Sequence, residues 1–125
     1  MDKKTILVVE DEQLIQKVLC DKLREEGFLV LEAINGQEGL EVAESKHPDL
    51  ILLDIIMPVM DGITMLKVLR QDSWGKDANV MLLTNLTEQE KVSEAIALGS
   101  FDYLVKTDWS LADVVKKIKE KLNIK

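Results

Sequence analysis

The sequence predicts an α/β fold in which five helices cover the two faces of a doubly wound sheet of five parallel strands. Short apolar segments and amphipathic segments alternate five times along the 125 residues. Three of the apolar segments are continuous runs, as expected of strands that are buried on both faces of a parallel sheet. Parallel strands need crossover helices, and those crossovers are right-handed, so the alternation leaves few other topologies.

The composition of the five apolar segments indicates which strands are central and which lie at the edges. The runs at 6–9, 50–53 and 80–83 are wholly apolar and suit the centre of the sheet. The segments at 28–33 and 101–105 are shorter or more mixed, which suits the edges. The order 2-1-3-4-5, the flavodoxin-like arrangement, meets both conditions. A ligand site is then expected beyond the carboxyl ends of strands 1 and 3, where the winding reverses.

Apolar stripes mark the helices between these strands. A stripe recurs at helical spacing in three of them, with members Leu14, Ile15, Val18, Leu19 and Leu23 in the first, Val92, Ala95 and Ile96 in the fourth, and Leu111, Val114, Val115, Ile118 and Leu122 in the fifth. Gly27 and Gly99 follow two of these stripes and predict helix ends.

Helix starts are predicted where a capping residue stands three positions before an acid. This spacing occurs at Asn35, Thr87 and Ser110, and Asp61 with Gly62 opens a further helix. The pair Asn35-Gly36 is also compatible with a hairpin turn. The helix-period run that begins near residue 40 makes the hairpin the weaker interpretation.

Composition limits the class of protein. A hydrophobic share of 46% and a charged share of 31% are typical of one soluble globular domain. With 23 acidic and 16 basic residues the net charge is −7, so direct binding to nucleic acid is disfavoured. A single cysteine forms no intramolecular disulfide, and no signal peptide or membrane-length apolar run is visible. We therefore expect a cytoplasmic protein that does not enter the membrane.

Polar residues stand directly after four of the predicted strands. Glu10 and Asp11 follow strand 1, Asp54 follows strand 3, Thr84 follows strand 4 and Lys106 follows strand 5. Because the strands are parallel, all of these residues are expected at one edge of the sheet, where open α/β folds carry their chemistry.

The three carboxylates would repel one another unless a cation lies between them. Mg²⁺ prefers oxygen ligands and typically combines one or two carboxylates with waters and a substrate phosphate. Three carboxylates, one Mg²⁺ (or Mn²⁺) and the Lys106 ammonium would cancel in formal charge. An arriving phosphoryl group would then be stabilised by the metal and by Lys106, so the pattern favours phosphoryl transfer to a carboxylate.

Five segments together resemble the receiver domain of bacterial response regulators. They are 6–12 (ILVVEDE), 50–58 (LILLDIIMP), Asp61-Gly62, Thr84 and 103–106 (YLVK), in order and at matching spacings. The resemblance covers essentially the whole chain, 1–125, with a core of about 4–122. It implies a two-component signalling protein, related to the single receivers of chemotaxis, that promotes only its own phosphorylation and dephosphorylation and is not a conventional enzyme.

The resemblance also implies a role for each matching residue. Asp54 would be the phosphoacceptor, served by a sensor histidine kinase or a phosphotransfer protein. Glu10, Asp11 and the main-chain carbonyl of Ile56 would complete its metal site.

Two further residues would act as switches in this resemblance. Thr84 would move to bond the phosphoryl group, and Tyr103 would turn inward as it does so. Lys106 would pair with the phosphoryl oxygens. The face built by helix 4, strand 5 and helix 5 would then bind a downstream protein target, or an output domain outside this chain.

Simpler interpretations stand beside these roles. Asp11 alone could be the N-cap of the first helix, Thr84 a strand-favouring residue, Lys106 a solvated chain end and Tyr103 an ordinary packed aromatic. An acid after the apolar run 50–53 is harder to explain, because burying it is costly unless it is paired or binds a metal.

Four positions depart from the commonest pattern of the family. Thr107 replaces a proline that is often preceded by a cis bond, and a non-proline cis bond costs roughly 2.5–4 kcal/mol. Asn85, Ile56 and Leu86 add bulk near the acceptor, which favours a long-lived phosphorylated state.

Rival function classes are weaker. A haloacid-dehalogenase-like phosphatase needs a second acid at the position held by Ile56, and a flavodoxin-like cofactor binder needs a phosphate-binding loop after strand 1. A degenerate receiver that serves only as an interaction module remains the alternative, although Glu10, Asp11, Asp54, Thr84 and Lys106 are all present.

Overall fold

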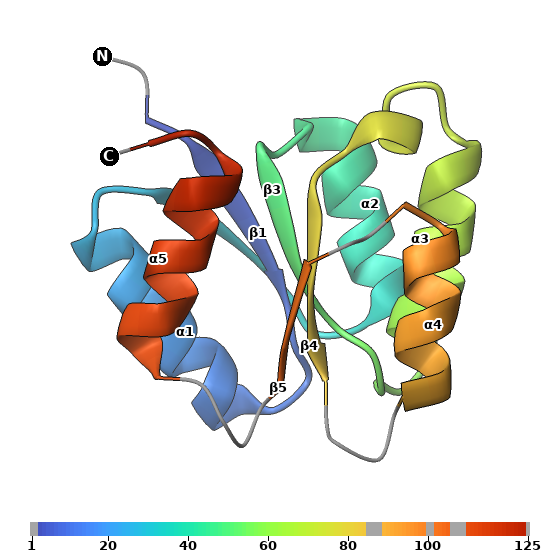
Figure 1. Cartoon of the computed structure of the whole chain (residues 1–125), viewed down its shortest axis with the longest axis horizontal. Helices are drawn as coiled ribbons and strands as arrows, with labels where there is room; N and C mark the ends of the chain where they lie inside the picture. Colours follow the sequence, from blue (N-terminus) through green and yellow to red (C-terminus); the bar gives the residue numbers. More distant parts are fainter. Residues whose placement is uncertain (1–2, 85–88, 100–101, 106–109, 125) are drawn as a thin grey trace.

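One five-stranded parallel sheet, covered by helices on both faces, organises the computed structural model (Figure 1). The structure describes residues 3–84, 89–99, 102–105 and 110–124, and at 84, 89–92 and 102–105 it describes the backbone alone. In chain order the elements are β1 (Thr5–Val9), α1 (Gln13–Glu25), β2 (Leu29–Ala33), α2 (Gly36–Lys46), β3 (Leu50–Asp54), α3 (Gly62–Gln71), the short 3-10 helix η1 (Gly75–Asp77), β4 (Val80–Thr84), α4 (Gln89–Ala97), β5 (Asp102–Val105) and α5 (Leu111–Lys121).

The strand order is β2-β1-β3-β4-β5, which confirms the predicted doubly wound topology. Every neighbouring pair is parallel, so the carboxyl ends of all five strands lie at the lower edge of the sheet in Figure 1. The winding reverses between β1 and β3. A site is therefore expected beyond the ends of these two strands.

The core consists of two layers, one on each face of the sheet. Successive strand side chains point to opposite faces, so Ile6 and Val8 of β1 pack with α1 and α5, while Leu7 and Val9 pack with α2 and α3. Figure 1 shows the same division, with α1 and α5 on one face and α2, α3 and α4 on the other. Burial on both sides explains why the central strands read as continuous apolar runs.

The helix ends confirm most of the predicted caps. The side-chain oxygens of Asn35 and Asp61 each accept a backbone N–H at 2.8 Å, from Glu38 and Thr64 respectively. Ser110 forms a reciprocal capping box with its partner three residues later. The hairpin interpretation at Asn35-Gly36 is thereby excluded, and the cap predicted at Thr87 lies outside the described residues.

Both predicted glycine stops also occur. Gly27 has φ +95° and Gly99 has φ +84°, a region that glycine enters without the steric cost of a Cβ. The strands differ from the prediction only at their ends. β1 begins one residue earlier, at Thr5, and β2 and β5 begin at Leu29 and Asp102. β3 and β4 each run on by one residue, to include Asp54 and Thr84. Asp54 stays in the sheet because its backbone pairs with that of Leu83.

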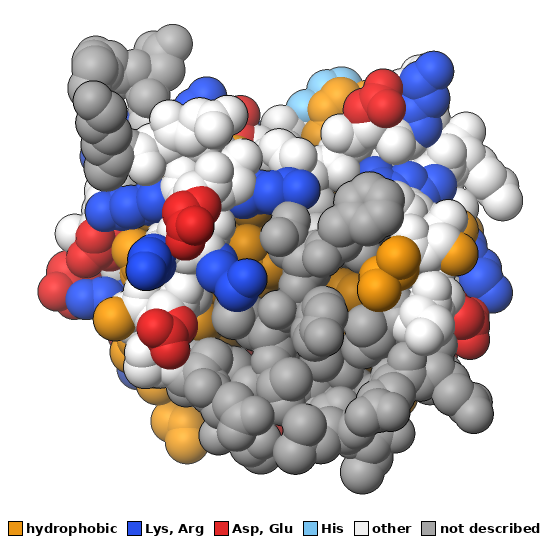
Figure 2. Space-filling view, in the orientation of Figure 1, with side chains coloured by type: hydrophobic (Ala, Val, Ile, Leu, Met, Phe, Trp, Pro, Cys, Tyr) orange, Lys and Arg blue, Asp and Glu red, His pale blue; other side chains and the backbone are white. Residues whose placement is uncertain are grey.

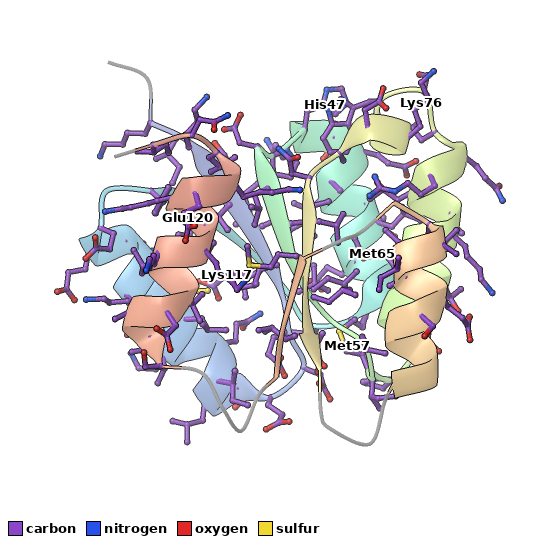
Figure 3. All side chains as sticks on the ribbon, viewed as in Figure 1. His47, Met57, Met65, Lys76, Lys117 and Glu120 are labelled. Atoms are coloured by element: carbon purple, nitrogen blue, oxygen red, sulfur yellow. The ribbon has the colours of Figure 1, made fainter. Side chains whose placement is uncertain are left out.

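The opposite edge of the sheet contains the chain's one histidine. His47 is exposed, adopts φ 47° as the C-cap of α2, and stacks on Trp74 with ring centroids 4.5 Å apart. Figure 3 shows His47 and Lys76 at this end of the molecule, away from the carboxyl ends of the strands. His47 is thus a surface residue, and Trp74 packs against it, a role that the sequence did not indicate.

Candidate functional site

Three carboxylates meet at the carboxyl ends of β1 and β3, where the sequence predicted them. Glu10 and Asp11 follow β1 directly, and Asp54 is the last residue of β3. Each offers an oxygen, and these oxygens all lie within 4.8 Å of one another. Glu10 is 0% exposed and Asp54 only 2%, whereas Asp11 is half-buried and opens the group toward solvent.

The chemistry of this donor set fits a small, hard divalent cation. Three carboxylate oxygens within 4.8 Å repel one another when ionised, and burial of two of them weakens the screening by water. A cation between them removes the repulsion and gains the oxygen ligands that Mg²⁺ and Mn²⁺ prefer. The half-buried side at Asp11 leaves room for waters or a substrate oxygen, which Mg²⁺ usually retains.

The alternative role for Asp11 as a helix cap is not supported. Helix α1 begins at Gln13, and its N-cap is Glu12, which makes no side-chain cap hydrogen bond. Asp54 likewise caps no helix, because α3 begins eight residues later at Gly62 and is capped by Asp61. The two acids at the strand ends therefore have no local structural task of this kind.

The loop between β1 and α1 is held by a buried glutamine that the sequence did not single out. Gln16 is 8% exposed, and its side-chain amide donates to the carbonyl oxygens of Ala33 at 2.8 Å and Glu10 at 3.3 Å. The backbone N–H of Glu10 donates to the same Ala33 carbonyl at 3.0 Å. Gln16 thus connects the acidic loop to the end of β2. The sequence feature that could have identified it is a polar residue on the buried face of a helix.

The loop between β3 and α3 is fixed by close backbone contacts. The N–H of Gly62 donates to the carbonyl of Ile55 at 2.7 Å. A Cβ at position 62 would lie 2.3 Å from the carbonyl oxygen of Asp54 and 2.9 Å from the Cα of Ile55. Only glycine allows the start of α3 to approach the end of β3 this closely.

A tight turn in the same loop is strained. The N–H of Met60 donates to the carbonyl of Pro58 at 2.7 Å, and the residue between them, Val59, has φ 66°. This is the geometry of a γ-turn with positive φ, which is uncommon for a β-branched residue. The carbonyl of Met60 then accepts the N–H of Gly36 at 2.8 Å, which anchors the loop to the start of α2.

The remaining predicted site residues are described only in part. The backbone of Thr84 ends β4 and pairs with Val105, and the backbone of Tyr103 pairs with Leu82 in β5. Their side chains, and all of Lys106, Asn85, Leu86 and Thr107, lie outside the described residues. Ile56 lies two residues after Asp54 and has a side chain that is 49% exposed. The direction of its carbonyl remains a prediction.

Four apolar side chains at the same edge of the sheet as the acidic group are about half exposed or more. Leu14, the second residue of α1, is 75% exposed, and Val59 in the β3–α3 loop is 82% exposed. Ile34, directly after β2, and Ile56 are about half exposed. All four follow the carboxyl ends of strands, so they share the edge of the acids and form an apolar rim, the term used below for these four side chains.

Among the described residues, no helix combines the length and the apolar composition needed to span a bilayer.

Comparison with known families gives one match over most of the chain. The family model described as "Response regulator receiver domain" matches residues 6–119. Transcriptional regulatory protein PdtaR of Mycobacterium tuberculosis strain H37Rv is 37% identical over 116 residues, which are 92% of this chain and 55% of that protein. Regulatory protein AtoC of Escherichia coli K12 is 40% identical over 101 residues, which are 81% of this chain and 22% of that protein. The chain thus spans about half or less of these relatives.

Solved structures of similar length share the whole fold. The chemotaxis response regulator CheY4 of Vibrio cholerae superimposes with a TM-score of 0.88 at 30% identity, covering 96% of this chain and 99% of that one. The receiver domain of sensor histidine kinase PA1611 from Pseudomonas aeruginosa PAO1 also gives 0.88, at 27% identity, with 98% and 99% covered. That structure has a magnesium ion coordinated in its active-site cleft.

Proposed function

The chain belongs to the response regulator receiver domain family, and on that premise we propose that Asp54 is its phosphoacceptor. The phosphoryl group would come from a phosphohistidine of a sensor kinase or of a phosphotransfer protein. The observation that carries the proposal is the group of three carboxylates, two of them buried, whose oxygens lie within 4.8 Å of one another at the carboxyl ends of β1 and β3.

The proposed site for the cation comprises Glu10, Asp11, Asp54 and the backbone carbonyl of Ile56. Mg²⁺ (or Mn²⁺), when bound there, supplies positive charge for the phosphoryl oxygens during transfer. The donor chemistry of the three acids supports this assignment. The magnesium ion in the PA1611 receiver belongs to that protein and gives independent support for the ion type.

The transfer itself asks little covalent chemistry of the protein. A carboxylate oxygen of Asp54 forms the new bond to phosphorus as the bond to the donor imidazole nitrogen breaks, and that nitrogen leaves with the electron pair. The main contribution of the protein to the transfer is to position the carboxylate of Asp54. Asp54 is held by its pairing with Leu83 and by the contact of Gly62 with the acceptor backbone. Lys106 and Thr84 would bind the phosphoryl oxygens, as the family resemblance implies.

The apolar rim favours a protein as the natural donor. Leu14, Ile34, Ile56 and Val59 would bury apolar surface against a partner that presents its phosphohistidine to Asp54. Replacing Leu14 by Ala should therefore slow transfer from a kinase while leaving phosphorylation by a small donor unchanged.

The consequence of phosphorylation would be a shift in the population of two conformers. Thr84 and Tyr103 would couple the phosphoryl group to the face formed by α4, β5 and α5. That face would bind a downstream protein, or an output domain if this chain is part of a longer regulator. The family context and the acidic charge also support a cytoplasmic protein that does not itself bind nucleic acid.

Two alternatives predict other outcomes. A dehalogenase-like phosphatase would require an acid at position 56, where the chain has isoleucine. A degenerate receiver would bind partners without being phosphorylated. Incubation with acetyl phosphate and Mg²⁺, followed by intact-mass measurement, separates these readings. We expect the mass of one added phosphoryl group, and none after chelation or in Asp54→Asn. Unmodified wild-type protein would favour the degenerate receiver.

A further inference from the structure

A groove of about 420 Å³ lies between α1 and α5, on the face of the sheet away from α2, α3 and α4. Its lining combines an apolar floor with charged walls and consists of Lys22, Glu26, Ala112, Val115, Lys116, Lys119, Glu120 and Ile124. The groove lines up with the second half of α1 and reaches past the end of α5. Its lining also includes Ala112, the second residue of α5, so the groove runs along nearly the whole of that helix. None of the three acids at the strand ends lines it.

The groove differs in charge from the chain as a whole. The protein carries −7, but the lining has three lysines against two glutamates. Glu26 is already neutralised, because Lys119 contacts one of its oxygens at 3.0 Å and Lys22 the other at 3.5 Å. The hydrogen bond from Lys119 is the main reason that the pKa of Glu26 is lowered. Figure 2 shows the basic side chains grouped over this region, with acidic ones between them.

Lys116 is the least explained of these cations. Lysines in the last turns of α1 and α5 stabilise the negative ends of the two helix dipoles, which accounts for Lys22 and Lys119. Lys116 lies in the middle of α5 and makes no ion pair with any residue that the structure describes. Beside it, Val115 is 7% exposed and contributes apolar floor.

We propose that this groove is the docking site of an acidic amphipathic helix from a partner protein. Apolar side chains of the partner would cover Ala112, Val115 and Ile124, and a carboxylate of the partner would pair with Lys116. Helices commonly bind in this way, with one apolar face laid in a groove between two helices. The site would act independently of Asp54, because none of the three acids at the strand ends lines the groove.

A random peptide display library, selected against the full chain, tests this assignment. We expect the selected peptides to carry Asp or Glu next to apolar residues and to shift amide resonances of α1 and α5. Lys116→Glu should weaken a synthetic copy of such a peptide by roughly tenfold, because one attraction becomes a repulsion. Lys117→Glu is the matched control. It makes the same charge change on the next residue, outside the groove lining, and should leave the affinity within about twofold.

Several results would overturn the proposal. They are a selection without acidic enrichment, an affinity unchanged by Lys116→Glu, or binding that is lost in Asp54→Asn. Concentration-dependent self-association that is abolished by Lys116→Glu would assign the groove to a second copy of the chain instead. Circular dichroism of each variant ensures that a lost affinity does not reflect a lost fold.

Discussion

Replacing Gly62 by Ala should damage both stability and phosphorylation, because the start of α3 touches the acceptor backbone. The added Cβ would lie 2.3 Å from the carbonyl oxygen of Asp54 and 2.9 Å from the Cα of Ile55, and ordinary contact begins at 3.4 Å. The contacted atoms belong to the backbone, so no flexible side chain can yield. The helix start and the acceptor strand must separate by about 1 Å, which also strains the hydrogen bond between the Gly62 N–H and the Ile55 carbonyl.

The magnitude follows from two opposing contributions. Overpacking and the weakened hydrogen bond cost about 3 kcal/mol together, and alanine returns at most about 1 kcal/mol of helix propensity. A net loss of about 2 kcal/mol should lower Tm by about 8 °C in a domain of this size. A displacement of about 1 Å at the nucleophile should slow phosphorylation by acetyl phosphate roughly 100-fold.

The assays are thermal unfolding by circular dichroism and single-turnover phosphorylation by acetyl phosphate. Gly27→Ala is the matched control, because Gly27 has φ +95° and no atom within 4 Å of its would-be Cβ. That substitution should cost about 1 kcal/mol through backbone strain alone and leave the rate unchanged. A Gly62→Ala protein that is phosphorylated at the wild-type rate would refute the positional argument. A Gly27→Ala protein with an equally slowed rate would do the same.

Three further substitutions test other parts of the site and core. Val59→Gly should raise the free energy of unfolding, measured in urea, by about 1 kcal/mol, because the backbone strain that is relieved at this positive-φ position exceeds the entropy cost of glycine. A lower urea midpoint would contradict the claim that the turn is strained. Gln16→Ala should lose about 1–2 kcal/mol of stability and bind Mg²⁺ less tightly, whereas substitution of the exposed Gln37 by Ala should change neither property. Equal Mg²⁺ affinities of the wild type and the two variants would show that Gln16 does not support the site. Burial raises the pKa of the Cys20 thiol from 9.0 to about 11, so iodoacetamide at pH 8 should label Cys20 only when the protein unfolds. The unfolded thiol ionises first, so the free energy of unfolding should fall between pH 9 and 11, and Cys20→Ala should lack that slope.

The fold could be predicted because its signals are local. Continuous apolar runs mark β1, β3 and β4, and their burial on both faces bears this out. Capping residues such as Asn35 and Ser110 can be recognised from three or four consecutive residues of the sequence. The convergence of Glu10, Asp11 and Asp54 followed from topology alone, because parallel strands deliver their following residues to one edge.

The supporting parts of the site could not be predicted, because they depend on contacts between distant segments. Gln16 reads as one polar residue in an amphipathic helix until the end of β2 is placed beside it. Gly62 reads as a helix-start glycine, and its contact with the Asp54 backbone emerges only when α3 docks on β3. The groove between α1 and α5 joins residues almost a hundred positions apart, as the Glu26–Lys119 pair illustrates.

Chemical trapping of the phosphorylated residue tests the central claim most directly. Borohydride reduces an aspartyl phosphate to homoserine, and peptide mass spectrometry then locates the change in the chain. After incubation with acetyl phosphate and Mg²⁺, homoserine should occur at position 54 and be absent when Mg²⁺ is chelated. Homoserine at Asp11 or at another acid, or trapping at position 54 that needs no divalent cation, would contradict the account.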